Sequence, residues 1–160
     1  MEAVFMRFIF IIFMQLSFAQ LPSYISNIAR QYKIDIKIVE GWSYAESSHY
    51  KYGHTGDALG RFGIRPCWFY DYLHYIGCDS NSIRDYKKLL TDDRNNTEIA
   101  CWSFAFWRRR GFTDREIMQI WLFGLHGVYE FGHWSDLYER RIFGDVQKVK
   151  LNYKAYERIK

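Results

Sequence analysis

The sequence has few cysteines and none of the common metal-binding motifs. Its three cysteines, Cys67, Cys78 and Cys101, form no C-x-x-C pair, and its five histidines form no H-E-x-x-H motif, so no metal site is predicted. Two cysteines can pair in an oxidising compartment. The ten residues between Cys67 and Cys78 make a plausible loop, but the sequence does not fix the pairing. At 160 residues, the chain can bury a core without disulfides or metals, and its length predicts one domain.

Strand patterns, internal repeats and phosphate-binding loops are absent as well. No stretch sustains apolar and polar alternation, and the glycines between residues 53 and 63 neither follow a strand nor precede a Lys-Ser/Thr pair. Ser47 and Ser48 lack a nucleophile elbow, which excludes a Ser-His-Asp catalyst there. The net charge of +4 and pI near 8.9 favour retention near an anionic polymer such as a cell wall, a nucleic acid or a membrane surface. They are far from the basic stripe typical of a nucleic-acid-binding protein, so no nucleic acid partner is predicted.

Residues 1–19 have the pattern of a secretion signal. Arg7 supplies a positive charge before a short apolar run, and Ser17-Phe18-Ala19 places small residues at the two positions that a signal peptidase reads. The run is too short to span a bilayer comfortably, so no stable membrane insertion is predicted after signal removal. We therefore expect a mature domain over residues 20–143 and a basic tail over residues 144–160. The mature protein would be secreted or periplasmic.

Apolar residues recur at helical spacing through most of the mature sequence. Pro22 and Asp35 are placed to begin two helices, and Glu46-Ser47 ends the second one before a polar loop. Five later segments show the same spacing, and these are residues 66–76, 83–90, 98–110, 114–123 and 135–143. Six or seven helices joined by short loops predict an all-α globule around one core.

Capping residues mark several helix boundaries. Thr113 and Glu116 form a capping box. Residues 79–82 are predicted to cap the segment 83–90, and residues 91–93 to cap the segment that starts at Glu98. Arg108-Arg109-Arg110 before Gly111 marks the C-terminal end of that segment, because cations favour helix C-termini.

Aromatic residues make up 20% of the sequence, with 13 Tyr, 13 Phe and 6 Trp. Most are expected in the core. The alternative is a carbohydrate groove in which ring faces stack on sugars, and composition does not choose between the two. Glu46 shares a helix face with Val39 and Trp42. A single Glu on a helix is usually a solvated surface residue, but apolar surroundings favour the neutral carboxyl form that a glycosidase acid needs near neutral pH.

An ordered set of short motifs resembles the lytic transglycosylase (SLT) domain of the lysozyme-like superfamily. Glu46-Ser47 is followed by Ala58-x-Gly60-x-x-x-Ile64-x-Pro66, and then by Asp93, Asn95-Asn96 and Ile99 ahead of an aromatic helix. That family has a Glu-Ser pair at a helix end, a G-x-x-Q-I-x-P turn, an Asn-Ile helix and a final aromatic-Asn-x-Gly turn. The order and spacing hold over most of the predicted mature domain.

The resemblance implies a lysozyme-like fold and a cofactor-free enzyme that acts on peptidoglycan glycan strands. It would cleave the β-1,4 bond between N-acetylmuramic acid and N-acetylglucosamine and leave a 1,6-anhydromuramyl product. Glu46, at a helix end facing a groove, would be the sole general acid and base. Ser47 would bind the sugar or orient Glu46, and Phe62 and Ile64 would line the groove floor. Whether a secretion or conjugation machine is a further partner is left open by the sequence.

Two positions depart from the family pattern. Gly63 stands where the family has Gln. The aromatic-Asn-x-Gly motif is replaced by Phe123-Gly124-Leu125-His126 in straight register, or by His126-Gly127 with a small shift. Gly63, Phe123 and His126 are therefore the positions at which we expect substrate binding to differ from the family.

Two other functions stay open at this point. A hydrolytic muramidase needs a second carboxylate, for which Asp57 is the only nearby candidate, and it is equally well an ordinary turn residue. His49 and His54 are also close to Glu46 in sequence, although loop histidines are usually solvated. The alternative from another class is a non-catalytic cell-wall-binding protein that retains the fold.

Overall fold

The computed structural model describes residues 21–79, 85–131 and 136–145. Within these ranges the chain forms seven helices and one very short hairpin, so the predicted all-α class is confirmed. None of the helices in these ranges is long and apolar enough to cross a membrane. The predicted signal, residues 1–19, and nearly all of the predicted tail lie outside the described residues.

The first two described helices begin where the sequence predicts. α2 (Ser23–Gln31) is followed by α3 (Ile36–Ser47), and the Asp35 carboxylate caps α3 by accepting a hydrogen bond from the Lys37 N–H at 2.9 Å. Ser48 ends α3 in a left-handed conformation, with φ of 52°. The Glu-Ser pair therefore lies at the C-terminal end of the helix, as predicted.

A glycine-rich loop connects α3 to α4 (Pro66–Tyr75). It contains β1 (His54–Thr55) and β2 (Ala58–Leu59), which pair antiparallel along their full length. A further bridge joins Leu59 to Ile64 and turns the chain back on itself. The segment is thus a compact folded loop.

The next two helices begin at other residues than the sequence predicts. α5 (Tyr86–Thr91) is capped by Asp85, which accepts a hydrogen bond from a backbone N–H at 3.0 Å, and α6 (Asp93–Arg109) is capped by Asp92 at 2.8 Å. The predicted cap at 79–82 is therefore wrong, and α6 starts before the predicted Glu98. For α5 a nearer aspartate reaches the unpaired N–H groups of the first turn, whereas Asp92 lies within the predicted cap at 91–93, which is confirmed. The predicted basic C-terminal end of α6 is confirmed.

α7 (Asp114–Phe131) begins with the predicted capping box. The Thr113 N–H donates to Glu116 Oε2 at 2.7 Å, and the Glu116 N–H lies 3.4 Å from Thr113 Oγ1. The helix is interrupted at Gly124, where φ is 71° and ψ is 165°. α8 (Asp136–Phe143) follows and confirms the last predicted helix.

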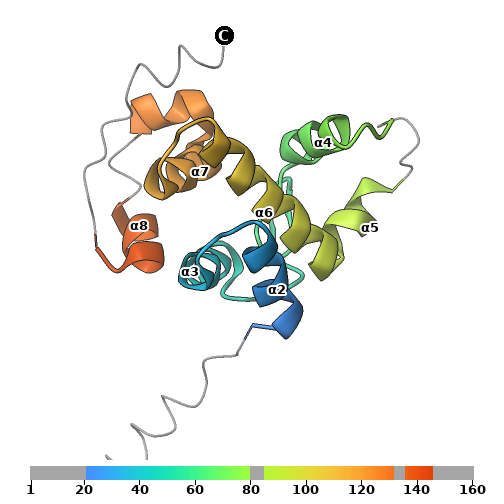
Figure 1. Ribbon diagram of the computed structural model, residues 1–160, viewed down its shortest axis with the longest axis horizontal. Coiled ribbons are helices and arrows are strands. Elements are labelled where there is room, and N and C mark those ends of the chain that lie inside the picture. Colours follow the sequence, from blue (N-terminus) through green and yellow to red (C-terminus); the bar gives the residue numbers. More distant parts are fainter. Residues whose placement is uncertain (1–20, 80–84, 132–135, 146–160) are drawn as a thin grey trace, which may run out of the picture.

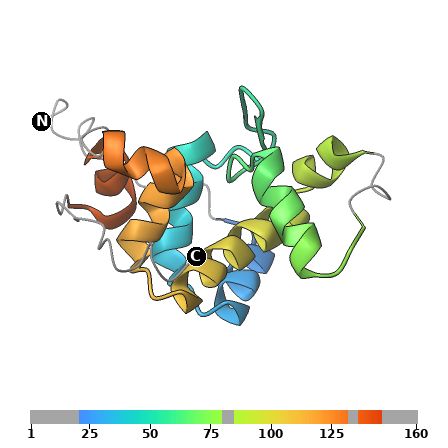
Figure 2. The same ribbon diagram turned by 90° about the horizontal axis from the view of Figure 1, so that it is seen from above.

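α6 is the central helix of the fold. It contacts α2, α4, α5 and α7, and Figures 1 and 2 show it crossing the molecule between them. α3 packs most extensively against α8, which lies beside it in Figure 1. The strongest helix–helix contact in the described chain is therefore made by the helix that carries Glu46.

The three cysteines are all described, and all three are free thiols. Cys67 is exposed and Cys101 is buried in the core. Burial raises the pKa of the Cys101 thiol, so it stays protonated. No pair of cysteines forms a disulfide in this structure.

Candidate active site

Glu46 lies at the end of α3 and is partly buried. Burial raises the pKa of Glu46 to about 7, while a hydrogen bond from Tyr138, the positive charge of Arg65 and a hydrogen bond from Trp121 act in the opposite direction. These three groups favour the ionised carboxylate, and burial outweighs them. At neutral pH the carboxyl is therefore divided between its acid and its base form. Such a group is suited both to giving a proton and to taking one back.

Two hydrogen-bond donors from different helices face the Glu46 carboxyl. Tyr138 on α8 donates its hydroxyl proton to Oε1, and Trp121 on α7 supplies the second hydrogen bond. Burial and the charge of Glu46 raise the pKa of Tyr138 well above its ordinary value, so Tyr138 remains a neutral donor. The carboxyl is thus oriented by two elements distant in sequence.

An apolar ring cluster covers the face of α3 that Glu46 shares with Trp42. Trp42, one turn earlier on α3, packs edge-on against Trp121 with ring centroids 4.7 Å apart and against Phe62 at 4.9 Å. Trp42 and Val39 have no exposed surface. The apolar helix face predicted for Glu46 is confirmed, and it accounts for the burial that raises the pKa.

Gly63 lies directly against the carboxylate. Its φ is 60°, and a Cβ built on it would lie 2.7 Å from Glu46 Oε2. Real Cβ atoms do not approach an oxygen this closely, so the Gln expected from the family pattern would require Glu46 to move. The glycine that replaces the family's Gln therefore leaves room for the Glu46 carboxylate.

Polar contacts from α6 hold the loop over the end of α3. Buried Arg61 makes two hydrogen bonds to Asp93, at 2.8 and 2.6 Å. The side-chain oxygen of fully buried Asn96 accepts the Phe62 N–H at 2.9 Å, and its amide donates to two backbone carbonyls at 2.9 and 2.8 Å. Asp93 and Asn96 belong to the sequence motif on α6, and in the fold they fix the loop that carries Gly63.

Of three predicted substrate-binding residues, two are fully buried and the third, Ser47, is partly buried. Phe62 and Ile64 have no exposed surface, so the prediction that they line a groove floor is wrong; they pack in the core because the folded loop turns them inward. The Ser47 hydroxyl lies 2.8 Å from the Arg61 carbonyl and 3.2 Å from the Ser43 carbonyl. Because both carbonyls are acceptors, the Ser47 hydroxyl is the donor, and its hydrogen bond to Arg61 ties the loop to α3.

Two further predicted positions lie around the interruption in α7. The side chains of Phe123 and His126 are outside the described residues, so their part in substrate binding stays a prediction. The backbone between them contains the kink at Gly124.

The alternative catalytic residues lie in the loop. The Asp57 side chain is 67% exposed and its Oδ1 is 3.8 Å from Arg65 Nε, so it is a solvated turn residue. His49 Nδ1 lies 3.0 Å from Ser43 Oγ, and burial lowers the pKa of His49. The side chain of His54 is outside the described residues.

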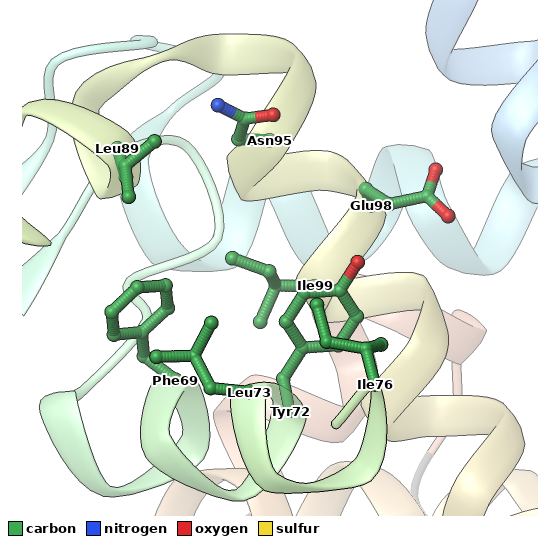
Figure 3. Close-up of a pocket in the computed structure, with 8 residues that line it drawn as sticks. All are labelled: Phe69, Tyr72, Leu73, Ile76, Leu89, Asn95, Glu98 and Ile99. Carbon is green, nitrogen blue, oxygen red and sulfur yellow. The ribbon is translucent and has the colours of Figure 1, made fainter. Parts of the chain in front are cut away.

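Two cavities in the described part of the chain lie away from Glu46. One, of about 220 Å³, lies between α4, α5 and α6; its walls are mainly apolar, with Asn95 and Glu98 at one edge (Figure 3). The other, of about 290 Å³, is lined by two tyrosines, Tyr24 and Tyr52, and by polar and charged residues, which are Lys51, Thr91, Asp92, Asp93 and Arg94. Glu46 lines neither of them, so the predicted groove beside it stays a prediction.

Within residues 21–79, 85–131 and 136–145, no group of three or more His, Cys, Asp or Glu side chains is placed to hold a metal ion. Comparison with known proteins found no match to any family model, curated protein or solved structure.

Proposed function

We propose that this protein is a peptidoglycan lytic transglycosylase with Glu46 as its general acid and base. The observation that carries the proposal is a partly buried carboxyl with a pKa near 7, oriented by Tyr138 and Trp121 at the end of a helix. The ordered motifs from Glu46 to the aromatic helix α6 add to it. They include Asp93 and Asn96, which hold the loop over the site.

In the proposed reaction Glu46 gives its proton to the glycosidic oxygen as the bond from that oxygen to C1 of the muramyl residue breaks. The resulting carboxylate takes the proton of the muramyl 6-hydroxyl, and that oxygen bonds to C1 to close the anhydro ring. Glu46 ends the cycle protonated, and no water is consumed. A pKa near 7 suits both steps, because the same group acts first as acid and then as base.

The one-carboxylate route is favoured over hydrolysis by the surroundings of Glu46. A second carboxylate beside Glu46 would raise its pKa, but among the described residues burial is what raises it, and Tyr138, Arg65 and Trp121 lower it. Asp57, the candidate second carboxylate, is solvated beside Arg65. Most hydrolytic glycosidases place two carboxyl groups across the bond they cleave.

The proposed substrate is outside the cytoplasm, which agrees with the secretion signal predicted for residues 1–19 and with the net positive charge. We propose the cell envelope as the site of action. Peptidoglycan glycan strands are then the partner, and the enzyme needs no cofactor.

The test is digestion of purified peptidoglycan by the wild type and by Glu46→Gln, with the products identified by mass spectrometry. We expect anhydromuramyl ends from the wild type and no cleavage by the variant. Reducing ends would replace the proposal with a hydrolytic muramidase. Binding to peptidoglycan without cleavage by either protein would leave a wall-binding protein, and cleavage by both would show that Glu46 is not the acid.

A further inference from the structure

α8 carries Tyr138, which donates a hydrogen bond to Glu46. The position of α8 against α3 is set by Gly41. A Cβ on Gly41 would lie 2.7 Å from the Ile142 Cα and 3.0 Å from the Arg141 carbonyl oxygen. These are backbone atoms of α8, which cannot rotate away as a side chain can. Because Ile142 is one turn after Tyr138, the close approach at Gly41 brings the hydroxyl within reach of Glu46.

A buried polar pair fixes α8 on its other side. Glu139 is 1% exposed, and its Oε1 accepts a hydrogen bond from Gln119 Nε2 on α7 at 2.7 Å. Its Oε2 lies 4.0 Å from Arg115 Nη1, and Arg115 also binds Asp145, just beyond α8. A buried carboxylate requires such partners, so Glu139 ties α8 to α7.

The same stretch of α7 carries Trp121, the second donor to Glu46. Gln119 is 4% exposed and Trp121 is 7% exposed. Gln119, which anchors α8, and Trp121, which is one of the two donors to Glu46, are therefore two residues apart on α7.

We propose that Gly41 and the Gln119–Glu139 pair are positioning residues, which hold α8 where the Tyr138 hydroxyl reaches Glu46. They do not touch the carboxyl themselves. Their catalytic importance rests on the proposed function, whereas the geometry they control is independent of it. Substitutions at these positions should act on the Glu46 site through the Tyr138 hydrogen bond.

The test measures the pKa of Glu46 by ¹³C NMR of its side-chain carboxyl in the full-length protein, with Glu46→Gln used to assign the signal. Tyr138→Phe should raise this pKa by about one unit, because it removes a hydrogen bond to the charged form. Gly41→Ala should move the pKa down towards its ordinary value, because α8 is pushed away and water enters. In the Gly41→Ala background, Tyr138→Phe should then have no further effect.

A second set of variants keeps the proposal testable if Gly41→Ala does not fold. Gln119→Leu removes the donor to Glu139 and should also reduce the effect of Tyr138→Phe. Glu139→Gln keeps an acceptor for Gln119 and should leave that effect intact. Arg140→Ala, at an exposed position of α8, is the control and should behave as the wild type.

The proposal is overturned if Tyr138→Phe shifts the pKa of Glu46 equally in the wild-type, Gly41→Ala and Gln119→Leu backgrounds. This result does not depend on glycan cleavage, so it is separate from failure of the proposed function. An inactive protein that shows the expected pKa changes would refute the activity and leave the positioning role standing.

Discussion

The close approach of Gly63 to Glu46 predicts that Gly63→Ala lowers the rate of glycan cleavage far more than it lowers the free energy of unfolding. Gly63→Ala places a methyl group 2.7 Å from Glu46 Oε2 at a backbone φ of 60°. The backbone strain costs about 1–2 kcal/mol of the free energy of unfolding. The carboxylate is the end of a flexible side chain, so it can move aside at little further cost to the fold.

The displaced carboxylate should nevertheless be a poor catalyst. A misplacement of about 1 Å can lower a rate by about 10²-fold, and Glu46 would also move relative to the Tyr138 hydroxyl. We therefore expect peptidoglycan cleavage by Gly63→Ala to fall by about 10²-fold while the protein stays folded. Mass-spectrometric quantification of the anhydromuramyl products at fixed pH measures the rate, and urea denaturation measures the stability.

Gly56→Ala is the matched control. Gly56 has a φ of 63°, and a Cβ there would have nothing within 4 Å, so the substitution carries the same backbone strain without touching Glu46. Its loss of stability should equal that of Gly63→Ala to within about 1 kcal/mol, and its activity should stay close to that of the wild type. Equal loss of activity in the two variants would refute the steric reasoning.

Three more outcomes follow from the same contacts. Tyr138→Phe removes a hydrogen bond that lowers the pKa of Glu46, so the alkaline limb of the pH–activity profile should move to higher pH; an unchanged or acid-shifted limb would contradict this. Asn96→Leu leaves the Phe62 N–H and two carbonyls without their partner and should lower the free energy of unfolding by about 3 kcal/mol or more, as measured in urea. A loss below about 1 kcal/mol would mean that water replaces the amide. Burial raises the pKa of Glu46 from 4.5 to about 7, so the folded state binds this proton more tightly than the unfolded state does. The resulting stability is fully present below pH 4.5 and is lost, by about 3 kcal/mol, as the pH rises through 7. Glu46→Gln lacks this titration, so its stability relative to the wild type should rise by that amount between pH 4.5 and pH 8; a constant difference would contradict the raised pKa.

The local part of the site was predictable from the sequence because its signals are local. Asp35 caps the helix, Trp42 lies one turn before Glu46, and the loop begins where glycines and polar residues replace the helical pattern. The capping box at Thr113 and Glu116 was predictable for the same reason.

The partners of Glu46 were not predictable, because they depend on how helices pack. Tyr138 is 92 residues away in sequence, and the pattern of α8 does not indicate which helix it covers. Phe62 and Ile64 were assigned to a groove floor by the resemblance to the transglycosylase family, yet the loop turns both inward. Helical periodicity identifies a buried face but not the surface it meets.

The most direct test of the account is a titration of the Glu46 side-chain carboxyl in the wild-type protein, followed by ¹³C NMR without any substrate. We expect an apparent pKa of about 7. A value near the ordinary 4.5 would mean that the carboxyl is ionised throughout the neutral range, and Glu46 would then not be the proton donor that the proposed reaction requires.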